Sequence, residues 1–230
     1  MGHRLGTFLL VIGIGVLVWT ATVYLWKDPF TTAYTAYEQR RLASNLDSAF
    51  ESWKPAGEAV TEPSDPEPDP DPEAESPARH DDVSREAKRF RIQSGDGDAI
   101  ARLRVPRLDL SLVVINGTSS GDLRRGPGRH EETFMPGEGE LVYVAGHRTT
   151  YGAPFSEINA LESGDEISLE LPYGSVRYEV TKHSIVDDND LSVLRSRGRE
   201  ELVLQACHPR FFASQRYLVY ARPVSTEARS

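Results

Sequence analysis

Three chemically reactive side chains stand at the ends of apparent strands. His147 follows the run LVYVAG, Cys207 follows LVLQA, and Arg216 precedes YLVYARP. A thiolate attacks carbonyl carbons, an imidazolium protonates a departing amine, and a guanidinium stabilises a developing oxyanion. Loops at strand ends expose such groups on a rigid scaffold. The three residues are therefore candidates for a nucleophilic acyl-transfer site.

Each of these residues also has an ordinary structural interpretation. Free cysteines are usually small buried hydrophobes, and Cys207 is the single cysteine of the chain, which excludes an intramolecular disulfide and a Cys-rich zinc site. His147 and Arg216 taken singly are compatible with a hydrogen-bonded loop imidazole and an ion-paired guanidinium. His208 adjoins Cys207, but neighbouring strand residues point to opposite faces, so we expect His147 to be the acid/base partner.

The elements that must position these groups are short. From Ala99 onward, β-branched runs alternate with Gly, Pro, Asn and Asp, which predicts an all-β sandwich or barrel. Short helices are predicted over residues 154–161 and 190–195, the second with Asp190 as its N-cap. Asp187, Asp188 and Asp190 are interpreted as this cap and solvated loop acids, and no metal site is predicted. The predicted strands cover residues 100–105, 111–115, 140–145, 166–171, 176–185, 201–206 and 217–223.

Charge and proline are concentrated between the candidate domain and the N-terminal region. The chain has 230 residues and a net charge of −9, and residues 54–82 hold ten acids, two bases and seven of the fifteen prolines. Such a segment repels itself and buries no core, so residues 54–98 are predicted to be a disordered linker and residues 99–230 the catalytic domain. Without clustered basic residues, no nucleic-acid partner is expected.

The N-terminal region predicts a membrane anchor followed by a helix. Residues 5–26 contain no charge and would span about 33 Å as a helix, close to the thickness of a bilayer core. We therefore expect residues 1–29 to be a transmembrane anchor, with a cleaved signal peptide as the alternative. In residues 30–53, apolar side chains recur at nearly helical spacing, which predicts a juxtamembrane amphipathic helix.

Residues 99–224 resemble the sortases, and most of all the class E sortases of actinobacteria. The resemblance is carried by LVYVAGHRTTYGAPFSEINALESGDEISL and LVLQACHPRFFASQRYLVYARP, by VPRLDL near the start, and by GPGRHEETFMPGEGE before the histidine. It implies an eight-stranded sortase β-barrel preceded by an N-terminal transmembrane helix. It also places His147, Cys207 and Arg216 on the catalytic His, Cys and Arg of the family.

The resemblance implies a membrane-anchored cysteine transpeptidase without a cofactor. Cys207 would attack the Thr-Gly bond of an LPxTG-like sorting signal, or its LAxTG form, on a surface protein. His147 would protonate the leaving amine, Arg216 would stabilise the oxyanion, and a peptidoglycan precursor or a pilin lysine would supply the acceptor amine. The expected location is the plasma membrane, with the domain on the extracellular side. Alternatives are a cysteine endopeptidase and a non-catalytic peptide-binding barrel.

One departure from the family pattern concerns substrate binding. The usual TLxTC run reads here as VLQAC, with Ala206 before Cys207, so a hydroxyl that would contribute about 1 kcal/mol through one hydrogen bond is missing. Ala206, Tyr143 and Tyr151 are the predicted substrate-binding residues, since both tyrosines bracket His147. Packing of the tyrosines against the barrel is the alternative interpretation.

Overall fold

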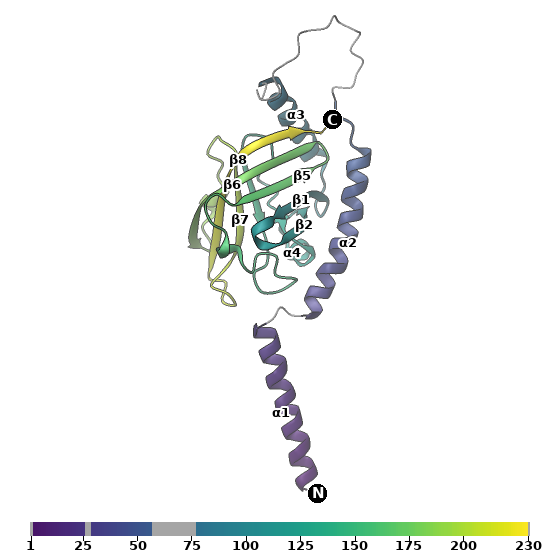
Figure 1. Cartoon of the computed structure of the whole chain (residues 1–230), viewed down its shortest axis with the longest axis vertical. Coiled ribbons are helices and arrows are strands. Elements are labelled where there is room, and N and C mark those ends of the chain that lie inside the picture. Colours follow the sequence, from purple (N-terminus) through teal and green to yellow (C-terminus); the bar gives the residue numbers. More distant parts are fainter. Residues whose placement is uncertain (1, 26–28, 57–76, 230) are drawn as a thin grey trace, which may run out of the picture.

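The predicted β-barrel is confirmed. The computed structural model describes residues 2–25, 29–56 and 77–229, and side chains in residues 4–20, 29–56 and 81–229. Eight strands close in the order β1-β2-β3-β4-β7-β8-β6-β5 (Figure 1). Their bounds are β1 Ala99–Val105, β2 Leu110–Asn116, β3 Gly128–Arg129, β4 Leu141–Ala145, β5 Glu166–Leu171, β6 Gly174–Asp187, β7 Glu201–His208 and β8 Gln215–Ala228.

The barrel interior is filled by alternate residues of its strands. In β5, Ile167, Leu169 and Leu171 are buried, while the residues between them remain partly exposed. This alternation follows from the two-residue period of a strand. Each such aliphatic side chain contributes about 1.5–3 kcal/mol on burial, so these side chains hold the barrel closed.

A second apolar layer covers the outer face of β4, β7 and β8. It is packed under Val186 at the end of β6 and under Val193 and Leu194 of the short helix η3 Leu191–Leu194. Because the middle of β7 is buried on both faces, Leu202, Val203 and Leu204 form a continuous apolar run rather than an alternating pattern. Below, this layer is called the outer apolar layer; it consists of Leu141, Tyr143, Val203, Leu218 and Tyr220.

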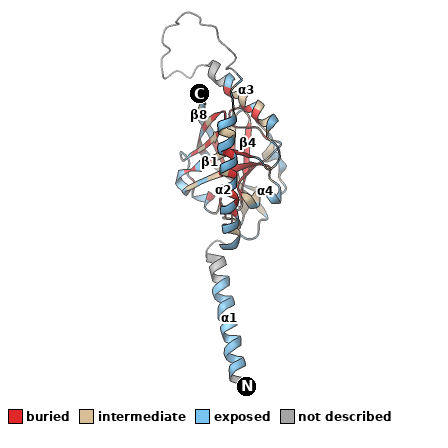
Figure 2. Cartoon of the chain, turned by 90° about the vertical axis from the view of Figure 1, so that its right-hand side faces the viewer, coloured by how far each residue is buried: buried red, intermediate tan, exposed pale blue. Residues whose placement is uncertain are grey.

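The helix predicted over residues 30–53 is present as α2 Pro29–Ser52, and it packs along the flank of the barrel (Figures 1 and 2). Leu42 and Leu46 are fully buried against β1 and β2. The amide of Gln39 accepts a hydrogen bond from the Val113 N–H at 2.7 Å and donates one to the Val113 carbonyl at 3.1 Å. The helix is therefore an integral layer of the folded domain.

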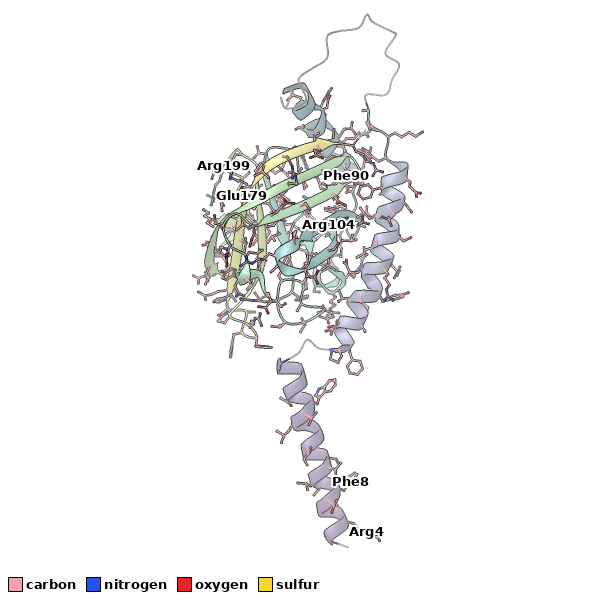
Figure 3. The ribbon with its side chains drawn as sticks, in the orientation of Figure 1. Arg4, Phe8, Phe90, Arg104, Glu179 and Arg199 are labelled. Atoms are coloured by element: carbon pink, nitrogen blue, oxygen red, sulfur yellow. The ribbon has the colours of Figure 1, made fainter. Side chains whose placement is uncertain are left out.

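The prediction of a disordered linker over residues 54–98 is wrong for its second part. Residues Pro77–Gln93 form helix α3, which buries Val83, Ala87 and Phe90 in the barrel core cluster. Phe90, labelled in Figure 3, lies with its ring 5.1 Å from Trp53 and 5.5 Å from Tyr173. The three buried residues have helical spacing, but the surrounding charges masked this signal. Residues 57–76 lie outside the described residues.

Helix α1 Gly2–Leu25 extends away from the barrel (Figure 1). Its described side chains are exposed along the helix (Figure 2), and they include Phe8, which is labelled in Figure 3. Within the ranges that the structure describes, no helix combines the length and the apolarity that a membrane crossing requires.

All seven predicted strands are present, and the shorter elements differ. The 190–195 helix is confirmed as η3, in which Asp190 accepts a hydrogen bond from the Ser192 N–H at 3.0 Å. Of the helix predicted over residues 154–161, only the 3-10 turn η2 Ile158–Ala160 is present. Strand β3 has only two residues, too few to produce a periodic pattern. Helix α4 Ser120–Arg125 begins with a Ser119–Asp122 capping box that the sequence analysis missed.

Candidate active site

Strand register brings the three candidate catalytic residues to one level of the barrel. Strand β4 runs parallel to β7 with Ala145 opposite Gln205, and the Gly146 N–H continues the ladder to the Gln205 carbonyl at 2.9 Å. Two residues further along, His147 reaches the level of Cys207. On the other side of β7, Cys207 is paired with Arg216 of β8. Neighbouring strands lie about 4.8 Å apart, so this register sets Cys207 beside Arg216 and directs the loop that begins at His147 toward the Cys207 end of β7.

The same three residues also share one face of the sheet. Val203 and Tyr220 are paired and belong to the outer apolar layer. Counting in steps of two along each strand places Cys207 and Arg216 on that same outer face. Continuing the alternation of β4 from Tyr143, which belongs to the outer apolar layer, predicts the same face for His147. The neighbouring Arg148 contacts groups of the opposite face, as described below.

The candidate nucleophile lies outside the apolar interior. Cys207 is partly exposed, whereas its neighbours Ala206 and Leu204 are fully buried in the barrel core. His147 and Arg216 are also partly exposed. A thiol at this position is accessible to a peptide while its strand stays anchored in the core.

The Arg216 guanidinium is held by backbone carbonyls. One of its amino groups donates to the Ala213 carbonyl at 2.8 Å and to the Gln215 carbonyl at 3.0 Å. The other lies 4.0 Å from a carboxylate oxygen of Asp188, which is half exposed. The two carbonyl contacts orient the planar guanidinium without neutralising its charge, and the half-exposed Asp188 carboxylate at 4.0 Å is a weak, solvent-screened partner, which leaves the guanidinium suited to bind an oxyanion.

The His147 imidazole is bounded by Tyr151 and by a positive charge. Its ring centroid lies 5.2 Å from that of Tyr151, at an interplanar angle of 33°. Burial lowers the pKa of His147 below its ordinary value, and the charge of Arg124 lowers the pKa further. The imidazolium form of His147 is therefore less populated near neutrality than that of an exposed histidine.

Replacing Arg124 with Gln should raise the pKa of His147. The substitution removes the second cause of the lowered pKa but leaves burial, the larger cause, so the titration midpoint should rise while remaining below 6.5. Proton NMR titration of the imidazole, assigned by its loss in His147→Gln, measures this. Arg104→Gln on β1 is the control and should leave the midpoint unchanged. An unshifted midpoint in Arg124→Gln would contradict the electrostatic cause.

The predicted substrate-binding residues occupy different environments. Ala206 has no exposed surface and packs in the barrel core. Tyr143 lies in the outer apolar layer with 5% of its surface exposed, and burial raises the pKa of its phenol. Most of the surface of Tyr143 is therefore packed against the barrel, as the alternative interpretation of this residue predicts. Tyr151 is partly exposed and lies against His147.

Arg148 is a residue of the site that the sequence analysis missed. It is 6% exposed and donates to the Cys207 carbonyl at 3.2 Å and to the Asn159 side-chain oxygen at 2.7 Å. Its guanidinium lies 2.9 Å from His208 Nδ1 and 5.3 Å from the Tyr217 ring centroid. Arg148 therefore ties the loop after His147 to the strand end that carries Cys207. The sequence signals it only by its position next to His147.

These contacts also account for His208. A guanidinium has only donors, so His208 Nδ1 must accept the hydrogen bond from Arg148 and carry no proton. The His208 ring also lies 5.8 Å from that of Tyr217. Its partners are on the face opposite Cys207, as the alternation of side chains predicts.

The closed barrel and the partly exposed thiol, imidazole and guanidinium on one face are together typical of a cysteine acyl transferase. Comparison with known proteins gives the family. Residues 103–224, more than half of the chain, match the Sortase domain family. The chain belongs to the sortase family, a family of cysteine transpeptidases, as the sequence resemblance implied.

Several relatives support this assignment. The chain is 32% identical to sortase D of Bacillus subtilis over 148 residues, which are 63% of this chain and 72% of that protein. It is 31% identical to sortase E1 of Streptomyces coelicolor over 151 residues, 58% of this chain and 43% of that protein. The crystal structure of the latter with a tripeptide in its active site aligns with a TM-score of 0.55 at 28% identity, over 59% of this chain and 94% of that one.

A further solved structure extends the fold comparison to the N-terminal region. A sortase D5 transpeptidase of Clostridium perfringens aligns with a TM-score of 0.62 at 20% identity. The alignment covers 82% of this chain and 99% of that one. The shared fold therefore includes more of this chain than the matched family domain alone.

Proposed function

We propose that this sortase cleaves an LPxTG-like sorting signal, in its LAxTG form, between Thr and Gly and joins the new carboxyl end to a cell-wall amine. The observation that supports the proposal is strand register: Cys207 of β7 is paired with Arg216 of β8, and His147 follows the end of β4, the strand paired with β7 on its other side. That arrangement matches what an acyl transfer through a thioester requires.

Each step of the proposed reaction has a group to perform it. The Cys207 thiolate attacks the Thr carbonyl carbon, and the resulting oxyanion accepts hydrogen bonds from Arg216. The tetrahedral intermediate collapses as the His147 imidazolium donates a proton to the departing Gly nitrogen, which leaves a Thr thioester on Cys207. An incoming amine then attacks the thioester, His147 accepts its proton, and the thiolate is released. Surface proteins and a peptidoglycan precursor or pilin lysine would be the two substrates.

Mass spectrometry of the full-length protein tests the proposal. With an LAxTG peptide alone, an adduct of the acyl fragment on Cys207 is expected. Adding a glycine-peptide amine should convert the cleaved peptide into the amide product. A hydrolytic endopeptidase would give the free acid regardless of the amine, and a peptide-binding barrel would give no adduct; either result would overturn the proposal.

We also propose that the N-terminal segment anchors the enzyme to the plasma membrane with the barrel outside. The proposal rests on the charge-free run over residues 5–26, which continues beyond residue 20, the last residue of α1 whose side chain the structure describes, and on the apolar side chains that helix α1 exposes. Cell fractionation tests it. The full chain should require detergent for release from membranes, and a chain beginning at Pro29 should not; a freely soluble full chain would contradict the anchor.

A further inference from the structure

Helix α2 makes direct contacts with the loop that follows His147. The Tyr151 N–H donates a hydrogen bond to the Thr31 hydroxyl at 3.0 Å, across 120 positions of sequence. One turn further along α2, the Thr35 hydroxyl donates to the Arg124 carbonyl at 2.8 Å. The N-terminal turns of α2 are thus bonded to two segments that surround the candidate acid/base residue.

The ring of Tyr151 lies between α2 and the imidazole. Its centroid is 6.5 Å from the Tyr34 ring, which meets it edge-on at 74°, and 5.2 Å from the His147 ring. The Arg124 guanidinium lies 5.7 Å from the same centroid. Tyr151 therefore connects the helix physically to the imidazole, with Arg124 alongside.

The backbone of this loop needs outside support. Tyr151 has a φ of 51° and Ala153 a φ of 44°. Both lie in the left-handed region, which residues other than glycine adopt only at a cost in conformational free energy. Such conformations persist only where surrounding contacts determine them. For Tyr151, the hydrogen bond to Thr31 and the ring contact with Tyr34 are contacts of this kind.

We infer that Tyr151 is a positioning residue for His147 and that helix α2 holds it in place. The inference rests on the proposed function, in which His147 moves the proton. It gives Tyr151 a role through the imidazole instead of the predicted role in binding substrate. It also gives α2, the helix next to the proposed anchor, a role in the active site, because α2 would fix the position of Tyr151.

Two substitutions at Tyr151 separate positioning from substrate binding. Asparagine tolerates a left-handed backbone, so Tyr151→Asn removes the ring with little backbone strain. Because misplacement by about 1 Å costs up to about 100-fold, kcat for transpeptidation should fall roughly 10- to 100-fold while KM changes less than about twofold. Tyr151→Phe keeps the ring and should retain kcat within about twofold. A raised KM with unchanged kcat in Tyr151→Asn would indicate substrate contact and overturn the inference.

Substitutions in α2 test its part separately. Tyr34→Ala, combined with Thr31→Val, removes both contacts to Tyr151 and should lower kcat about 10-fold. Tyr37→Ala is the matched control, because Tyr37 lies on the same helix and is 58% exposed, and it should leave kcat unchanged. The imidazole NMR signal of His147 should broaden or split in the double variant and in Tyr151→Asn, but not in the Tyr37 variant.

Further measurements keep the outcomes distinct. Thermal unfolding of each variant shows whether a loss of kcat reflects a loss of fold. Unchanged kcat and an unchanged His147 signal in folded Tyr151→Asn would overturn the inference while leaving the proposed reaction intact. A wild-type protein that forms no thioester would instead contradict the proposed function, and the imidazole signal would still report whether Tyr151 orders the ring.

Discussion

Replacing Cys207 with Ala should eliminate transpeptidation while leaving the protein folded. No other described side chain at this level of the barrel supplies a thiol, and the chain contains no second cysteine. Loss of the nucleophile in enzymes of this kind lowers kcat by about 10⁴-fold or more. Because the partly exposed side chain belongs to neither the barrel core nor the outer apolar layer, the free energy of unfolding should change by less than about 1 kcal/mol.

The measurement is a comparison of product formation and adduct mass between the wild type and Cys207→Ala. The variant should form neither the thioester nor the amide product, yet still bind the sorting-signal peptide, since the peptide contacts are not removed. Cys207→Ser is the control for shape, and it should also lack the thioester. Product formation by the Ala variant at the wild-type rate would exclude the covalent mechanism.

The second large effect is expected at Arg216. Removing a preorganised donor to an oxyanion typically lowers kcat by about 10²- to 10³-fold, and Arg216→Ala should fall in this range. Arg216→Lys should recover only part of the loss, because an ammonium lacks the planar arrangement of donors that the Ala213 and Gln215 carbonyls hold in place. Steady-state kinetics with a sorting-signal peptide provide the measurement.

Arg222 on the same strand supplies the matched control. Its guanidinium pairs with Glu179 at 3.2 Å on the exposed surface, and such pairs contribute about 0–1 kcal/mol to stability. Arg222→Ala should therefore leave kcat unchanged. Equal kcat for the Arg216 and Arg222 variants would show that the guanidinium of Arg216 takes no part in the transition state.

The strands could be predicted from the sequence because each is a local pattern. Residues 166–171 alternate between apolar and polar, and the strand predicted over residues 201–206 contains the short apolar run 202–204. Both strands are present, the second extending to His208. Helix α3 was missed because its buried residues are few and lie among charged ones. Phe90 of this helix is buried against Trp53 and Tyr173, which are distant in sequence. Local composition predicts solvation there, and only tertiary packing overrides it.

The candidate catalytic residues were identified from residue types, from their positions at strand ends and from resemblance. What surrounds them was decided by closure of the barrel. Which face of β7 points inward depends on the strands that pair with it and on the loop that covers its outside. The orientation of β7 buries Ala206 and leaves Cys207 partly exposed. A run of apolar residues in the sequence does not indicate which face of the strand points inward.

The sequence by itself determined the all-β class, the approximate positions of the strands around the site, and which thiol, imidazole and guanidinium are the candidate catalytic groups. Only the tertiary structure decided that Arg148 donates a hydrogen bond to the Cys207 carbonyl and that Thr31 of α2 accepts one from the Tyr151 N–H, beside His147. The physical reason is that strand patterns are local, with a period of two residues. These supporting contacts join segments between 59 and 120 positions apart, and only the folded chain brings them together.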